Sequence, residues 1–266
     1  TQIFNALNTS YMKQLHSFFA LIILLTGMVG WGQTTLNIGD IAIIGMSTGD
    51  EDFAFVTFVD LDAGTEIYFT DEEADGDLTI GTGEGTVLYT APSGGVTAGT
   101  VITGNSAGTA TNFSATADGS LALGNSGDGL LAYQGTSVGN VTTFLHHVGE
   151  DSGDRGTFPG STLASSDWLE MGADDGNYTG TTSGSASALF SSVNNVSNWT
   201  VSGSASISPP VSFTIATGGP TVGYDAVSSS ENETNSTFSV NIPVTLSNYG
   251  SSQVDLSVTL SGGSYE

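Results

Sequence analysis

The chain has 266 residues, of which 38% are hydrophobic and only 11% are charged. Nearly all of the charge is acidic, with 27 Asp and Glu against 2 Lys and Arg, giving a formal net charge of -25. This balance excludes nucleic acid as a partner, because phosphate neutralisation needs basic side chains, and it favours divalent cations as ligands. The absence of cysteine excludes disulfides, thiolate-bound zinc and a cysteine nucleophile.

The first predicted element is an export signal. Residues 1–11 precede the first methionine and show no pattern, so they are left unassigned. From Met12, Lys13 supplies a positive charge, and residues 18–29 form an apolar run shorter than the about 20 residues that span a bilayer. Small residues on both sides of Trp31 then predict cleavage of a signal peptide at residues 12–32, leaving Gln33 first. We therefore expect a secreted or cell-surface protein with no integral membrane segment after cleavage.

Short strands separated by glycine-containing turns follow, which is the pattern of an all-β sandwich. Apolar residues on both faces of residues 53–59 predict a strand inside a sheet, and residues 186–193 are the one helix expected after the signal. The predicted strands are Ile41–Met46, Phe53–Val59, Glu66–Thr70, Thr86–Thr90, Thr100–Thr103, Ser120–Leu123, Gly129–Gln134, Val141–Leu145, Trp199–Ser202 and Val211–Ile215.

A linker and a second β pattern follow the first domain. Glycine and proline in residues 216–220 indicate a linker between domains at 33–215 and 221–266. Apolar residues alternate strictly over 238–246 and 254–260, and Pro243 on the opposite phase predicts an edge strand. Two or three strands are too few to bury a core, so we expect the chain to stop inside this second sandwich.

Several segments, taken in order, resemble a known family. IGDIAIIGM through FTD at residues 38–71, GTVLYTA at 85–91, GDGLLAYQG at 127–135, and residues 175–178 with 198–200 resemble a lamin-tail-like domain of secreted bacterial proteins. The resemblance covers residues 36–217 and implies an immunoglobulin-like β-sandwich without catalytic residues. Residues 221–266 are similar to the start of a Calx-beta domain, and their S-x-x-E implies one calcium-ligand position, Glu231.

The densest acidic cluster spans residues 71–78. Asp71, Glu73 and Asp75 occupy positions 1, 3 and 5 of a calcium loop, and Asp77 adds a fourth carboxylate. Thr82 stands where an EF-hand loop has its bidentate glutamate, which argues against an EF-hand. Two interpretations stay open: a looser calcium loop between strands, or a solvated acidic hairpin tip.

Other candidate residues have ordinary explanations. His146 and His147 are expected to be a surface pair that shares no metal, because adjacent strand residues point to opposite faces. The loop clusters at 50–52 and 174–177 have two explanations that stay open, ion binding and the ordinary use of Asp, Gly and Asn in turns. Trp168, Tyr178 and Trp199 are the aromatic candidates for stacking a sugar, and Trp199 is expected in the core.

Three functional hypotheses follow from these observations. The first is a non-catalytic module of a larger bacterial surface or secreted protein, acting in adhesion, display or spacing, with calcium as a possible stabilising ion and surface glycans or surface proteins as partners. The second is the accessory region of an exported hydrolase (a nuclease, phosphatase or protease) whose catalytic domain lies further along the chain. The third makes residues 33–217 themselves an enzyme that uses the two histidines, although no G-x-S-x-G elbow supports it.

Overall fold

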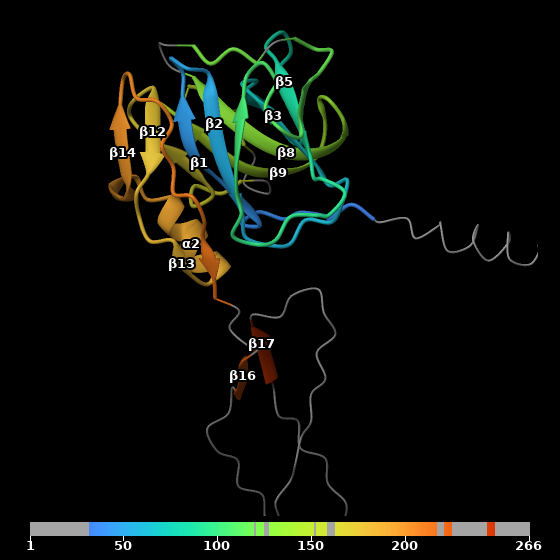
Figure 1. Ribbon diagram of the computed structural model, residues 1–266, viewed down its shortest axis with the longest axis vertical. Helices are drawn as coiled ribbons and strands as arrows, with labels where there is room; N and C mark the ends of the chain where they lie inside the picture. The colour runs from blue at the N-terminus through green and yellow to red at the C-terminus, as the bar shows by residue number, and fades with distance from the viewer. Residues whose placement is uncertain are drawn as a thin grey trace, which may run out of the picture.

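The computed structural model describes residues 32–119, 121–124, 128–151, 153–158, 163–216, 221–224 and 244–247. Two sheets pack face to face over residues 32–216 (Figure 1). The first sheet is antiparallel and has the order β14 (Trp199–Ser202), β12 (Asp175–Tyr178), β1 (Ile41–Ser47), β2 (Asp52–Thr57) and β6 (Val101–Asn105). The predicted all-β sandwich is confirmed.

The second sheet has six strands, of which only β11 and β9 run parallel to each other. Its order is β11 (Trp168–Glu170), β9 (Asn140–Gly149), β8 (Gly129–Ser137), β3 (Glu66–Thr70), β5 (Thr86–Thr90) and β7 (Phe113–Ala115). Three smaller pairs complete the described strands: β4 (Ala74–Asp75) with β10 (Gly156–Thr157), β13 (Ser183–Gly184) with β15 (Thr214–Ile215), and β16 (Thr221–Tyr224) with β17 (Val244–Ser247).

The main core lies between the two sheets and is rich in aromatic rings. Phe69 of β3 lies with its ring centroid 4.9 Å from those of both Phe53 and Phe55 of β2. Tyr89 of β5 meets Phe55 edge to face at 5.3 Å. Such aromatic pairs contribute about 0.5–1.5 kcal/mol each beyond their buried area. These rings therefore stabilise the packing of one sheet on the other.

A second, smaller core lies on the outer face of the second sheet. Because alternate residues of a strand face opposite sides, Tyr68 and Tyr133 turn away from the main core and stack at 5.1 Å. Ala74 and Leu163, from the segments on either side, are buried against them. The loops that carry β4 and β10 therefore act as a cover for this sheet.

Helix α2 (Ala186–Val193) and the short helix η1 (Val196–Asn198) follow β13. Ser185 caps α2, because its side chain accepts a hydrogen bond from the N–H of Ala188. The buried residues of α2, among them Leu189 and Phe190, belong to the main core. The predicted helix and the predicted core position of Trp199, which is 7% exposed, are both confirmed.

Most predicted strands are present, and three expectations are corrected. Residues 121–124 form no strand, and Ser120 lies outside the described residues. The closing strand at 211–215 is reduced to Thr214–Ile215. Residues 175–177 form the buried strand β12 instead of a turn, since each pairs with β14. The expectations for Pro243 and for residues 254–260 fall outside the described residues.

Strand β12 also holds a covering segment against the first sheet. Asp175 is 1% exposed; one of its oxygens accepts from the N–H of Thr48 (2.6 Å) and the other from the N–H of Ala205 (2.8 Å). Two residues further on, Asn177 donates to the carbonyl of Ser206 at 3.1 Å. These buried side chains thus join the turn after β1 to the segment after β14.

We predict that Asp175→Asn destabilises the fold. One carboxylate oxygen becomes an amide donor that faces a backbone N–H, so at least one buried hydrogen bond is lost, at a cost of about 1–3 kcal/mol. Urea unfolding should show a lower midpoint with an unchanged slope. Asp50→Asn, in an exposed turn, is the matched control, and equal midpoints for the two variants would contradict the role given to Asp175.

Candidate functional site

Three glutamates converge on the segment that links β3 to β5. The N–H of Gly81 donates to the carbonyl of Glu73 at 2.9 Å, and the N–H of Glu84 donates to Oε1 of Glu72 at 2.6 Å. The segment therefore folds back on itself and brings Glu84 beside Glu72 and Glu73. One carboxylate oxygen from each of the three lies within 4.8 Å of the others. We call Glu72, Glu73 and Glu84 the glutamate cluster.

The structure gives the five predicted calcium ligands different places. Glu73 belongs to the glutamate cluster, whereas Asp75 and Asp77 are exposed on the outer part of the loop. Asp71 is 4% exposed, and its two oxygens accept from the N–H groups of Gly85 and Ala122, both at 2.8 Å. Glu231 lies outside the described residues.

Sequence reasoning missed Glu72 and Glu84. The calcium-loop pattern takes its ligands from positions 1, 3 and 5, and Glu72 falls at position 2. Glu84 lies beyond the acidic run, after several glycines and threonines. The alternation of Gly81, Gly83 and Gly85 was an available signal. Gly83 has φ of 120°, and a Cβ at Gly81 would lie 2.7 Å from Oε2 of Glu72. These glycines permit the close turn that returns Glu84 to the cluster.

Several carboxyl groups in and around the glutamate cluster have raised pKa values. The Glu84 side chain is exposed, but desolvation by the protein around it and then the neighbouring carboxylates raise its pKa to about 7. Burial also raises the pKa of Glu72, against the opposing effect of the N–H of Glu84. Burial raises the pKa of Asp128 to about 6, with Asp71 and Asp154 contributing repulsion. A cation at the glutamate cluster would relieve this repulsion, and carboxylate oxygens are the ligands that calcium prefers.

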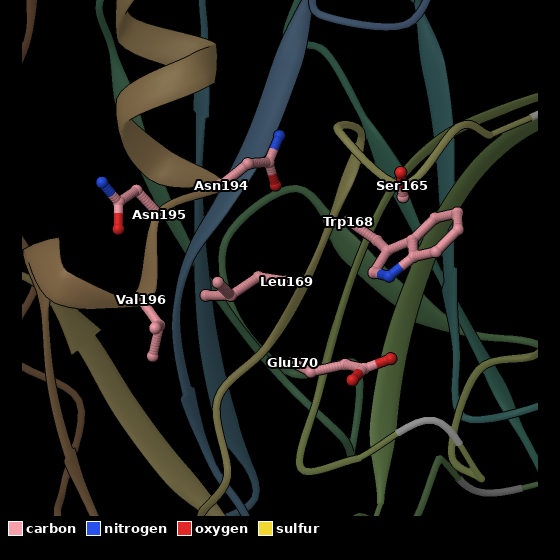
Figure 2. A pocket seen from close by; sticks show the side chains of 7 residues that line it. All are labelled: Ser165, Trp168, Leu169, Glu170, Asn194, Asn195 and Val196. Atoms are coloured by element: carbon pink, nitrogen blue, oxygen red, sulfur yellow. The ribbon is translucent and has the colours of Figure 1, made fainter.

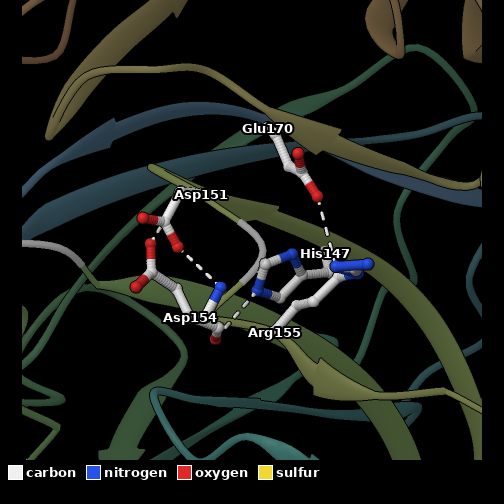
Figure 3. A network of polar contacts seen from close by, with 6 residues as sticks. His147, Asp151, Asp154, Arg155 and Glu170 are labelled. Atoms are coloured by element: carbon white, nitrogen blue, oxygen red, sulfur yellow. Dashed lines mark hydrogen bonds and ion pairs between the residues drawn. The ribbon is translucent and has the colours of Figure 1, made fainter.

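The one basic side chain of the described ranges, Arg155, lies elsewhere. Its Nη1 is 3.1 Å from Oε1 of Glu170 (Figure 3). Its guanidinium lies 4.4 Å from the ring centroid of Trp168. Lys13 is outside the described residues. Arg155 therefore holds strand β11 to the segment after β9.

The two histidines are buried, so the expected surface pair is wrong. His146 is 0% exposed; its Nδ1 accepts from the N–H of Ile43 (3.0 Å), and its protonated Nε2 therefore donates to Asn194 (2.9 Å). His147 is 1% exposed, and its Nε2 lies 3.3 Å from the carbonyl of Asp154 (Figure 3). Burial lowers the pKa of His146 to about 4 and that of His147 to about 3.

The histidines also serve separate parts of the fold. The ring of His146 lies 5.4 Å from that of Phe190 in α2, whereas His147 lies 6.2 Å from Phe158 in the cover of the second sheet. They therefore contact opposite sides of β9, as the sequence predicted. Both are neutral at physiological pH, and each hydrogen-bonds a backbone group, which is the behaviour of structural histidines.

A cavity of about 460 Å³ lies between β11 and the end of α2 (Figure 2). Its lining residues are Ser165, Trp168, Leu169, Glu170, Asn194, Asn195 and Val196. Trp168 and Glu170 both contact Arg155, and the amide oxygen of Asn194 is bonded to His146. Three of the lining side chains thus contact other protein groups, whereas Nδ2 of Asn194 is buried without a hydrogen-bond partner.

Comparisons with protein-family models, with curated protein sequences and with solved structures find no match to this chain. Among the helices that the structure describes, none has the length and apolar character to cross a membrane.

We predict that the raised pKa of Glu84 makes stability depend on pH. Because the folded chain holds this proton more tightly than the unfolded chain, the penalty is full above pH 7 and is relieved as the pH falls towards the ordinary value of 4.5. Glu84→Gln should therefore raise the Tm at about pH 8 in EDTA, and the gain should shrink on acidification and vanish below about pH 4.5. Asp77→Asn is the control, and a gain independent of pH would contradict this account.

Proposed function

We propose that this chain contributes a non-catalytic, extracellular β-sandwich module to a larger bacterial surface or secreted protein. Its role is adhesion, display or spacing, and a calcium ion bound by the glutamate cluster stabilises it. Glu72, Glu73 and Glu84 supply carboxylate oxygens, and carbonyl groups and water would complete the six to eight ligands that calcium takes. The observation that carries the proposal is the approach of three carboxylates to within 4.8 Å of one another.

The use of the ionisable groups supports a structural role. His146 and His147 are buried against backbone groups on opposite sides of a strand. The buried aspartates Asp71 and Asp175 accept hydrogen bonds from backbone N–H groups in segments distant along the chain. These four buried side chains stabilise the fold through hydrogen bonds to the backbone. A stable fold is what a module that displays or spaces other domains requires.

Export supports an ion-stabilised module in a second way. A signal peptide at residues 12–32 would deliver the chain to a compartment where calcium is more abundant than in the cytoplasm, and extracellular calcium modules bind with Kd values of about 10⁻⁴–10⁻³ M. A cluster of only three carboxylates, two of them exposed, fits such modest affinity better than a tight cytoplasmic site.

We predict that calcium raises the Tm of the purified chain and that EDTA reverses the increase. Binding to the folded state alone contributes about 2.7 kcal/mol when calcium is a hundredfold above its Kd. The test is a calcium titration at pH 7.5, followed by differential scanning fluorimetry, with magnesium in parallel. No shift at millimolar calcium would contradict the calcium site.

Two paired variants locate the ion. Glu73→Gln combined with Glu84→Gln should abolish the calcium-dependent shift, because it removes two ligands from the glutamate cluster. Asp75→Asn combined with Asp77→Asn removes the same charge from the outer part of the loop and should keep the shift. The reverse result would move the ion to the outer loop.

Turnover of nucleic acid, glycan or peptide panels by the purified chain would contradict the non-catalytic role.

A further inference from the structure

We infer that the mature chain begins with a pyroglutamate formed from Gln33, a modification that closes its N-terminus. The inference rests on the proposed export, because cleavage after Gly32 makes Gln33 the first residue. It adds a covalent step that export alone does not require.

The chain is anchored from the residue after Gln33 onwards. The N–H of Thr34 donates to the hydroxyl of Thr65 at 2.9 Å. The side-chain amide of Gln134 then holds both sides of the segment: its Nε2 donates to the carbonyl of Thr34 at 2.9 Å, and its Oε1 accepts from the N–H of Leu36 at 2.7 Å. Leu36 is 0% exposed and lies in the main core. The folded domain thus begins at Thr34.

Gln33 itself is exposed. Its α-amine and its side-chain carboxamide are therefore both open to solvent once the signal peptide is removed. In cyclisation the amine nitrogen attacks Cδ of the same residue, a new C–N bond closes a five-membered lactam, and the side-chain nitrogen leaves as ammonia. The atoms balance without an oxidant, a reductant or another reactant.

The fold tolerates the product. Cyclisation uses the amine and side chain of Gln33 and leaves the peptide bond to Thr34 unchanged, so the hydrogen bond from Thr34 to Thr65 is kept. The reaction also removes the N-terminal positive charge. With an ordinary α-amino pKa near 8, about a tenth of the amine is still neutral at pH 7, so cyclisation proceeds.

The test uses the full chain with its own leader, exported by a Gram-negative host and recovered from the periplasm. We predict an intact mass one ammonia below that of the chain starting at Gln33, and no signal in Edman degradation. During incubation in phosphate buffer at physiological temperature, any remaining free amine should convert completely. Gln33→Asn is the matched control, because its shorter side chain would have to close a four-membered ring. It should keep its full mass and remain sequenceable.

The contrary outcomes are distinguishable. A free Gln33 amine that persists through the incubation overturns pyroglutamate and leaves the proposed function intact. Cleavage at another position overturns the modification and the processing site, but still supports export. An uncleaved chain in the cytoplasm overturns the inference together with the extracellular role.

Discussion

The structure depends on one constraint: buried carboxylates must be satisfied with almost no basic side chains. Asp71 and Asp175 meet it in the same way, since each accepts hydrogen bonds from two backbone N–H groups. Asp128, which is half-buried, does the same. Hydrogen bonds to a charged acceptor are worth more than neutral ones, about 1.5–3 kcal/mol. They also tie together segments far apart in the chain, because Asp71 joins residues 85 and 122, and Asp175 joins residues 48 and 205. In this protein acidic residues perform the cross-linking that disulfides and ion pairs perform elsewhere.

Backbone donors leave the net charge of the carboxylates in place. An N–H group offsets the loss of hydration for one oxygen, but it adds no positive charge to oppose a neighbouring carboxylate. The raised pKa values of Glu84 and Asp128 are the result, with repulsion from nearby acidic groups adding to desolvation in both. The histidines show the opposite effect of burial, since they are held neutral. Protons or a divalent cation are therefore the remaining means of lowering the repulsion.

Sequence patterns predicted the elements whose residues obey a local rule. Glu66–Thr70, Thr86–Thr90 and the helix Ala186–Val193 were predicted with their observed bounds, because apolar periodicity and turn residues mark both ends. Residues 175–177 were not, since Asp-Gly-Asn is locally typical of a turn and becomes a strand through its pairing with β1 and β14. The prediction of the candidate site was incomplete for the same reason. A fixed ligand spacing found Glu73, whereas Glu84 reaches the cluster through a fold of the loop that depends on glycines and on a hydrogen bond to Glu72.

The position of the glutamate cluster explains why an ion there would act on stability. The segment that carries it also carries β4, which pairs with β10 and buries Ala74 in the second core against Tyr133. Glu72 and Glu73 lie just before β4, and Glu84 lies just before β5 of the second sheet. An ion bound by all three would connect the cover of the second core to the sheet beneath it. It would thus reinforce the attachment that Asp71 already makes through the N–H of Gly85. Losing the ion would loosen this cover first, before the aromatic core between the two sheets.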